Sequence, residues 1–238
     1  MTRHFGALIP STNTTVEIEY SHLLPAEVAQ AHYGRVMSSN YGASPFASPL
    51  DADVEYQAKL LGTARVEMIC LIQTSACLFS EDYDEVTCAR ITRASDGIPA
   101  LTSAMAIGGA LKALGARNVA LVSPYSDEVN ARARHYFEGK HGVAIVALEG
   151  FAAKDSYMIG KLGPENARDA FARIDRPEIE AFVVPGGNFP TMASIPGWER
   201  EFKKPVVTTN QASVWAILRR LGSTGRIPGL GKLLEIPA

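Results

Sequence analysis

The stretch Val66-Glu67-Met68-Ile69 decides the fold, because a matching stretch, Ile179-Glu180-Ala181-Phe182, follows at an offset of 113 residues, from position 66 to position 179. The same offset carries Ala7-Leu8-Ile9 onto Ala120-Leu121-Val122. Both pairs have the apolar, β-rich character of buried strands. A repeat of this size predicts two similar α/β lobes with a ligand between them.

A third match occurs at a slightly shorter offset. The segment from Pro99 to Gly115 opens with PALTS and resembles the segment from Pro205 to Gly222, which opens with PVVTT. We therefore expect lobes at 1–115 and 116–222, followed by a strap at 223–238. The alternative that the last helix and the tail pack on the first lobe stays open.

Short apolar runs alternate with helical patterns along the whole chain, which indicates parallel βαβ units and an α/β fold of two pseudo-symmetric lobes. Each lobe is expected to hold a mainly parallel sheet flanked by helices. The expected strands are Phe5–Ile9, Gln30–Val36, Met68–Ile72, Val119–Val122, Ala144–Leu148, Ala181–Val184 and Pro205–Thr208. The expected helices are Thr15–His22, Val54–Ala64, Asp82–Ser95, Ser103–Leu114, Asp127–His141, Glu165–Arg173, Ile195–Phe202 and Ser213–Leu221.

The composition restricts the class of protein. A net charge of −2 gives no electrostatic reason to bind nucleic acid or an anionic membrane. No signal peptide or membrane-spanning segment is recognisable. The chain has three cysteines, Cys70, Cys77 and Cys88, and this small odd number does not suggest a disulfide framework. These features predict a cytoplasmic protein.

Several catalytic motifs are missing. The five histidines have no metal-ligand spacing, and HExxH, GxGxxG after a strand, the Walker loop and GxSxG are all absent from the sequence. We therefore expect neither a metal nor a nucleotide cofactor.

Small hydroxyl and amide residues follow the predicted strands. In a parallel sheet these carboxyl-end loops meet at one edge, where ligands bind. Any one of them is also explained by helix capping, but the set together favours a binding site. The loops are 10–14, 73–75, 123–126, 185–188 and 208–210.

Four motifs resemble the aspartate/glutamate racemase superfamily, and most closely its branch of maleate cis-trans isomerases and arylmalonate decarboxylases. They begin at Pro10 (PSTNTTVE), Ser123 (SPYSDEVN), Asn188 (NFPTM) and Pro205 (PVVTT). The resemblance implies cofactor-independent chemistry on a small carboxylate. It also implies a cysteine from each lobe facing one carbon of the substrate, with only one cysteine kept in the decarboxylases.

Both cysteine positions of that pattern hold other residues in this chain. The pattern Cys-Thr-Ser is matched by Gln73-Thr74-Ser75, and Cys-Thr-Asn is matched by Gly186-Gly187-Asn188. The offset of the internal repeat pairs Gln73 with Gly186 independently. Glutamine cannot ionise and glycine has no side chain, so neither supplies an acid.

The supporting positions of the family pattern are better matched. The resemblance assigns carboxylate binding to Asn13, hydrogen-bond donation to Thr74 and Ser75, and an active-site role to Tyr125. Gly187 would offer its amide and Asn188 its side chain. The second asparagine of the isomerases falls near Ser156, which argues against a maleate-like substrate.

A second register places Cys77 in the first cysteine position, since Ala76-Cys77-Leu78 resembles the isomerase motif Ala-Cys-Leu. This register moves the strand end by four residues. A cysteine near a helix start can be a nucleophile or an acid. Cys70 and Cys88 are expected to be packing residues.

We expect an enzyme acting on a small carboxylate or dicarboxylate, with a decarboxylase or other lyase reaction favoured. The alternatives are an isomerase or racemase that uses Cys77, and a carboxylate-binding protein without activity. A homo-oligomer stays open, because the apolar side chains Phe46, Phe79, Phe189 and Met192 can line either a pocket or a dimer face.

Overall fold

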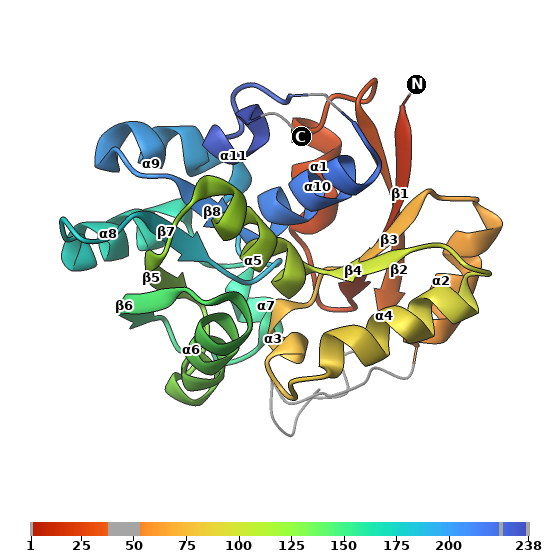
Figure 1. The fold of residues 1–238 in the computed structure, drawn as a ribbon, viewed down its shortest axis with the longest axis horizontal. Helices are drawn as coiled ribbons and strands as arrows, with labels where there is room; N and C mark the ends of the chain where they lie inside the picture. The colour runs from red at the N-terminus through yellow and green to blue at the C-terminus, as the bar shows by residue number, and fades with distance from the viewer. Residues whose placement is uncertain (1, 38–52, 224–225, 237–238) are drawn as a thin grey trace.

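The computed structural model describes residues 2–37, 53–223 and 226–236, and it contains two four-stranded parallel sheets. The first has the order β2-β1-β3-β4 and the second has the order β6-β5-β7-β8. The two lobes therefore share one topology, as the repeat predicts (Figure 1). The first sheet consists of β1 (Arg3–Pro10), β2 (Ala29–Val36), β3 (Met68–Leu71) and β4 (Ala100–Thr102). The second consists of β5 (Asn118–Ser123), β6 (Ala144–Gly150), β7 (Ala181–Val184) and β8 (Val206–Thr208).

The two lobes differ by one residue in the pairing of their central strands. In the first sheet Leu8 pairs with Leu71, whereas in the second Leu121 pairs with Val183 rather than Val184. A constant offset of 113 would pair Leu121 with Val184. The loops that follow β3 and β7 are therefore not related by a simple shift along the sequence.

Helices cover both sheets. In the first half they are α1 (Val16–Leu23), α2 (Val54–Thr63), α3 (Thr74–Cys77), α4 (Tyr83–Ala94) and α5 (Ser103–Leu114). In the second half they are α6 (Asp127–His141), α7 (Ser156–Ile159), α8 (Pro164–Ile174), the 3₁₀ turn η1 (Met192–Ser194), α9 (Ile195–Phe202), α10 (Thr209–Arg220) and α11 (Lys232–Glu235).

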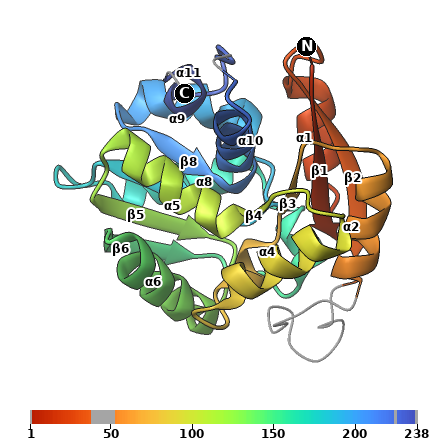
Figure 2. The same ribbon diagram turned by 45° about the vertical axis from the view of Figure 1, so that its right-hand side comes forward.

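Two of these helices join the lobes. Helix α5 follows β4 of the first sheet but contacts β8 and α6 of the second lobe, while α10 follows β8 but contacts β3 of the first sheet. The two helices also pack on each other, and Figure 2 shows α5 in front of the second sheet with α10 beside it, on the side of the first lobe. Helix α10 thus contacts both the second sheet, which it follows, and the first sheet.

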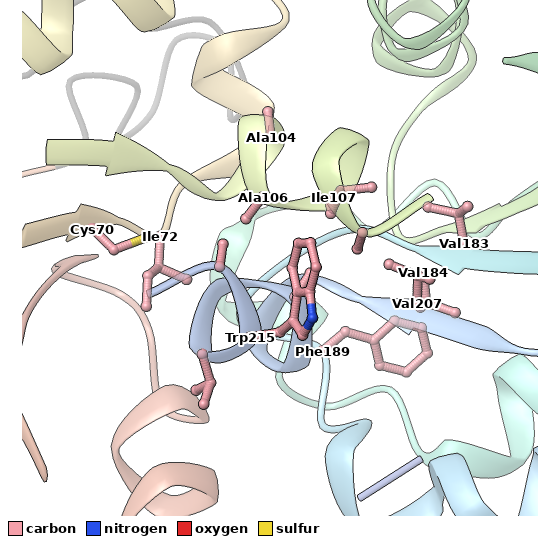
Figure 3. Close-up of a cluster of buried hydrophobic side chains, with 14 of the residues drawn as sticks. Cys70, Ile72, Ala104, Ala106, Ile107, Val183, Val184, Phe189, Val207 and Trp215 are labelled. Carbon is pink, nitrogen blue, oxygen red and sulfur yellow. The ribbon is translucent and has the colours of Figure 1, made fainter. Parts of the chain in front are cut away.

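One hydrophobic core runs through the junction of the lobes. Figure 3 shows Cys70 and Ile72 from the first lobe, Val184 and Phe189 from the second, and Trp215 from α10 in one cluster. Phe189 and Met192 are completely buried inside the chain, so neither is exposed on a surface where a second copy could bind. Phe79 is partly buried. Phe46 lies outside the described residues. Parallel strands covered on both faces require such continuous apolar runs.

Most predicted elements are confirmed within one or two residues, but α10 is not. It begins at Thr209, four residues before the predicted start at Ser213, because β8 passes directly into the helix with no loop between them. The short strand β4 passes into α5 in the same way, and the Thr102 hydroxyl accepts the N–H of Met105 as an N-cap. Strand β4, which has three residues, was not among the predicted strands.

The tail packs on the second lobe and on α10. The side-chain amide of Gln211 donates to the Leu230 carbonyl at 2.8 Å, and the Lys232 N–H donates to the Glu199 carboxylate at 2.8 Å. Within the described parts of the chain, no helix has both the length and the apolar character that crossing a bilayer requires.

Candidate active site

The hydroxyl of Thr74 is the centre of the polar contacts between the lobes. Its oxygen lies 2.9 Å from the Ser103 hydroxyl and 3.0 Å from the Thr209 hydroxyl. A further hydrogen bond joins it to Tyr125. Thr74 follows β3, Ser103 opens α5, Thr209 opens α10 and Tyr125 follows β5, so four strand ends meet here.

Gly186 belongs to the same network through its backbone. Its N–H donates to the Thr209 hydroxyl at 2.8 Å, and its φ of +106° lies in a region that favours glycine. A side chain here would place Cβ 2.9 Å from Cγ of Pro124 and 3.6 Å from the Tyr125 hydroxyl. The residue in the second cysteine position of the family pattern thus faces Tyr125, as a site residue must, but its backbone suits glycine alone.

Gly187 contacts the residue before Gln73. A Cβ on Gly187 would lie 2.9 Å from a methyl carbon of Ile72. The Gly187 carbonyl accepts a hydrogen bond from the Asn210 side chain at 3.0 Å. The two loops that correspond to the family's cysteine positions therefore touch across the lobe junction.

Tyr125 is fully buried at this junction. Burial raises the pKa of its phenol well above the usual range, and the hydrogen bond with Thr74 lowers it only in part. Tyr125 therefore remains a neutral hydroxyl that can donate a hydrogen bond at physiological pH.

The side chains of the two asparagines in the predicted site bind backbone groups of neighbouring loops and helices. The Asn13 side-chain oxygen accepts the N–H groups of Thr15 and Val16, both at 3.0 Å, and so holds the start of α1. The Asn188 side-chain oxygen accepts the Thr14 N–H at 2.8 Å, and its amide donates to the Ser156 carbonyl at 2.7 Å. Asn188 thus fastens the loop before α1 to the second lobe, rather than presenting a free amide.

Ser75 and Ser156 each adjoin a residue of this junction. Ser75 is in α3 next to Thr74 and is partly buried, and Ser156 opens α7 and is fixed to Asn188. The structure therefore gathers the predicted residues near one junction, with Thr74, Tyr125, Gly186 and Gly187 in its interior.

Gln73 lies between Ile72 and Thr74, and only 8% of it is exposed. Its side-chain oxygen is buried and has no hydrogen-bond partner among the described residues. Its backbone, with φ of −141° and ψ of 71°, is accessible to any L residue, in contrast to Gly186.

Cys77 occupies a different environment. Strand β3 ends at Leu71, and Cys77 ends α3 with its thiol completely buried. Burial raises the pKa of that thiol far above its usual value, and the nearby Asp84 carboxylate raises it further. The thiol donates to the Gln73 carbonyl at 3.7 Å, and its interactions with Thr102 and the Ala104 backbone place it near the start of α5. This geometry disfavours the register in which Cys77 is the reactive thiol.

Glu19 is a residue of the junction that the sequence analysis missed, whereas its partner Asn210 lay in a predicted loop. Glu19 of α1 is buried and accepts the N–H groups of Thr191 and Met192 at 2.6 and 2.8 Å. Its second oxygen accepts the Asn210 amide at 2.6 Å. Nothing in the sequence set Glu19 apart from other helical carboxylates.

The family model described as arylmalonate decarboxylase matches residues 5–234. The chain belongs to the arylmalonate decarboxylase family. The structure describes no group of three or more histidine, cysteine, aspartate or glutamate side chains placed to hold a metal ion.

The relatives of this arylmalonate decarboxylase family member include both isomerases and decarboxylases. The chain is 29% identical to the maleate isomerase of Nocardia farcinica, covering 98% of this chain and 96% of that one. It is 26% identical to the maleate isomerase of Alcaligenes faecalis, covering 98% and 97%. It is 24% identical to the arylmalonate decarboxylase of Bordetella bronchiseptica, covering 97% and 95%.

Solved structures agree with this family fold. The Nocardia farcinica maleate cis-trans isomerase bound to TRIS superposes with a TM-score of 0.86 at 27% identity, covering 98% of each chain. The maleate isomerase of Pseudomonas putida S16 with maleate gives a TM-score of 0.88 at 23% identity, covering 99% and 98%, which shows the shared fold.

Proposed function

We propose that this protein is a cofactor-independent lyase that decarboxylates a small carboxylic acid through an enediolate. The observation that carries the proposal is the Thr74 hydroxyl, which bonds to Ser103, Thr209 and Tyr125 at the junction of the lobes. This network provides neutral donors for a carboxylate, and neither cysteine position holds a thiol.

The substrate of this reaction has two carboxylates on one carbon, and the neutral donors would bind the one that is not lost. When the neighbouring carboxylate leaves as carbon dioxide, the electrons of the broken carbon–carbon bond form an enediolate. Its two oxygens carry more negative charge than the starting carboxylate. Hydroxyl groups of Thr74, Ser75 and Tyr125 and the Gly187 N–H, aimed at those oxygens beforehand, stabilise that charge more than the ground state.

A proton must then reach the carbon. Tyr125 is assigned to the enediolate oxygens rather than to the carbon, and the Cys77 thiol is packed near the start of α5. Gln73 can hold a water molecule through its unpartnered side-chain oxygen. We therefore assign the proton to a water molecule oriented by Gln73, and the hydroxide that remains combines with the released carbon dioxide to give bicarbonate.

Isomerisation is the second candidate, supported by the names of most relatives. A Nocardia farcinica isomerase variant is described with a covalently bound succinylcysteine intermediate, which requires a cysteine in that enzyme. In this chain the corresponding adduct would have to form on Cys77. The buried, hydrogen-bonded thiol of Cys77 argues against that route.

A carboxylate-binding protein without activity is the third candidate. One experiment separates all three: purified protein is incubated with substituted malonates and with maleate, and carbon dioxide, product acids and thermal shift are recorded. Carbon dioxide release supports the lyase, and fumarate formation from maleate supports the isomerase. A thermal shift without turnover supports the binding protein.

A further inference from the structure

Asp84 carries a carboxylate that is fully enclosed by groups from both lobes. It lies in the first turn of α4, and 0% of its side chain is exposed. One oxygen accepts the Thr102 hydroxyl at 2.5 Å. The other accepts the Tyr136 hydroxyl at 2.5 Å and the Lys140 ammonium at 3.1 Å. A buried carboxylate is tolerated where a cation and hydrogen bonds replace its hydration, and these donors supply both.

The donors to Asp84 join α6 to the first lobe. Thr102 ends β4 of the first sheet, whereas Tyr136 and Lys140 belong to α6 of the second lobe. Burial and the Asp84 carboxylate raise the pKa of the Tyr136 phenol, so this hydroxyl keeps its proton and remains a donor. Lys140 also donates to the Glu81 carbonyl at 2.9 Å, which holds the loop between α3 and α4. Helix α6 therefore anchors Asp84 from the second lobe.

Thr102 connects this carboxylate with the candidate site. Its hydroxyl donates to Asp84, and the same oxygen accepts the Met105 N–H at 3.2 Å, so this side chain also caps α5. The next residue, Ser103, opens α5, and its hydroxyl oxygen lies 2.9 Å from that of Thr74. Two consecutive residues at the start of α5 thus bind Asp84 and Thr74.

The position of the Thr74 hydroxyl matters for the proposed reaction. A donor stabilises an enediolate oxygen most when it is aimed there before the charge develops. A misplacement of about 1 Å can lower a rate by a factor of about 100. Ser103 holds Thr74 from the start of α5, and Thr209 holds it from the start of α10. A group that fixes the start of α5 therefore also fixes the aim of Thr74.

We propose that Asp84, anchored by α6, is a positioning residue that holds the start of α5 and thereby keeps Ser103 against Thr74. This inference rests on the proposed function, because Thr74 is assigned there to the enediolate oxygens. Asp84 itself touches no substrate and acts through Thr102 and Ser103. Loss of the Thr102 link should therefore affect turnover more than loss of a hydroxyl donor on α6.

Two variants that each remove one hydroxyl donor to Asp84 test this route. Thr102→Val removes the donor that leads to Ser103, and Tyr136→Phe removes a donor on α6. With substituted malonates as substrates, we expect Thr102→Val to lower kcat at least about tenfold, with a smaller change in KM. Tyr136→Phe should lower kcat less than about threefold, because Lys140 still anchors Asp84.

The conservative variant Thr102→Ser keeps the hydroxyl and should retain kcat within about threefold of wild type. A loss in Thr102→Ser as large as in Thr102→Val would overturn the proposal, since the hydroxyl would then not be the link. Equal kcat values in Thr102→Val and Tyr136→Phe would also overturn it.

A double-mutant cycle shows whether Asp84 acts through Ser103. Asp84→Asn keeps the shape but puts an amide beside the donors of α6, and it should lower kcat at least about tenfold. In a Ser103→Ala background the same substitution should lower kcat less than about twofold, because the hydroxyl that Asp84 positions is already gone. Equal factors in the two backgrounds would overturn the route through Ser103. If Asp84→Asn does not fold, the Thr102 variants decide.

Alkylation of Cys77 reports on the start of α5 without any turnover. Its buried thiol lies beside Asp84, Thr102 and the Ala104 backbone. Native protein is treated with iodoacetamide, and labelling is followed by peptide mass spectrometry. We expect Cys77 to be labelled at least about fivefold faster in Thr102→Val than in Tyr136→Phe, because only the first variant loosens the start of α5.

The two readouts separate this inference from the proposed function. If wild type turns over no malonate while Cys77 labelling differs as expected, the proposed function is overturned, and the hold of Asp84 on the start of α5 stands without its role in decarboxylation. If malonates are decarboxylated but kcat and labelling are equal in Thr102→Val and Tyr136→Phe, this inference is overturned and the proposed function stands.

Discussion

Thr74 and Thr209 lie 135 residues apart in the sequence and in different lobes, yet their hydroxyl oxygens are 3.0 Å apart. Thr209 also accepts the Gly186 N–H, so one side chain links the end of β3, the start of α10 and the glycine loop after β7. This link makes the geometry of the site depend on the relative position of the lobes.

Replacing Thr209 by Val should destabilise the protein by about 1–3 kcal/mol, because the buried Gly186 N–H and Thr74 hydroxyl both lose a partner. Ser103→Ala is the matched control, since it removes only one bond to Thr74. Urea unfolding should give a clearly larger loss for Thr209→Val. Equal losses would show that Thr209 does not hold the glycine loop.

Restoring a thiol should be far easier at Gln73 than at Gly186. Any side chain at Gly186 has a strained backbone at φ of +106° and a 2.9 Å contact with Pro124, whereas the Gln73 backbone is ordinary. We expect Gly186→Cys to lose about 1–3 kcal/mol of stability and Gln73→Cys to lose less, as measured by urea unfolding. Gly186→Ala is the control for backbone strain alone. A Gly186→Cys variant as stable as wild type would contradict the claim that a side chain at this position strains the backbone.

The Cys77 thiol should be dispensable for activity and slow to alkylate. Burial raises its pKa, so little thiolate is present at neutral pH. Cys77→Ala should retain turnover of the true substrate near the wild-type rate, and iodoacetamide should label wild-type Cys77 only on unfolding, as followed by mass spectrometry. Loss of turnover in a folded Cys77→Ala variant would restore Cys77 as the catalytic thiol. Cys88→Ala controls for general effects of removing a thiol.

Glu19 should make the stability of the protein pH-dependent. Burial raises its folded-state pKa above the ordinary value of 4.5, despite three hydrogen bonds that lower it. Its contribution is therefore fully present below about pH 4.5 and is lost as the pH rises through the folded pKa. As the pH rises through the folded-state pKa of Glu19, the free energy of unfolding of wild type should fall relative to that of Glu19→Gln. Urea titrations at a series of pH values test this, and a difference independent of pH would contradict it.

The sequence alone predicted two similar parallel sheets and the strand-end loops that meet between them. The two apolar runs at Ala7 and Ala120 and the repeated Val66 and Ile179 stretches predicted two similar parallel sheets, because buried parallel strands demand continuous apolar runs. Thr74 and Tyr125 were assigned by resemblance, and both meet in one network because the carboxyl ends of parallel strands share an edge.

Only the tertiary structure decided how these pieces work together. Glu19 and Asn210 are 191 residues apart, so no local pattern could show their contact. In the structure, the Asn188 side chain accepts the Thr14 N–H and so joins the two lobes, and the Cys77 thiol lies near Asp84. Periodicity records which residues are buried, but the partner of a buried polar group depends on how distant segments pack, and that packing is a property of the whole fold.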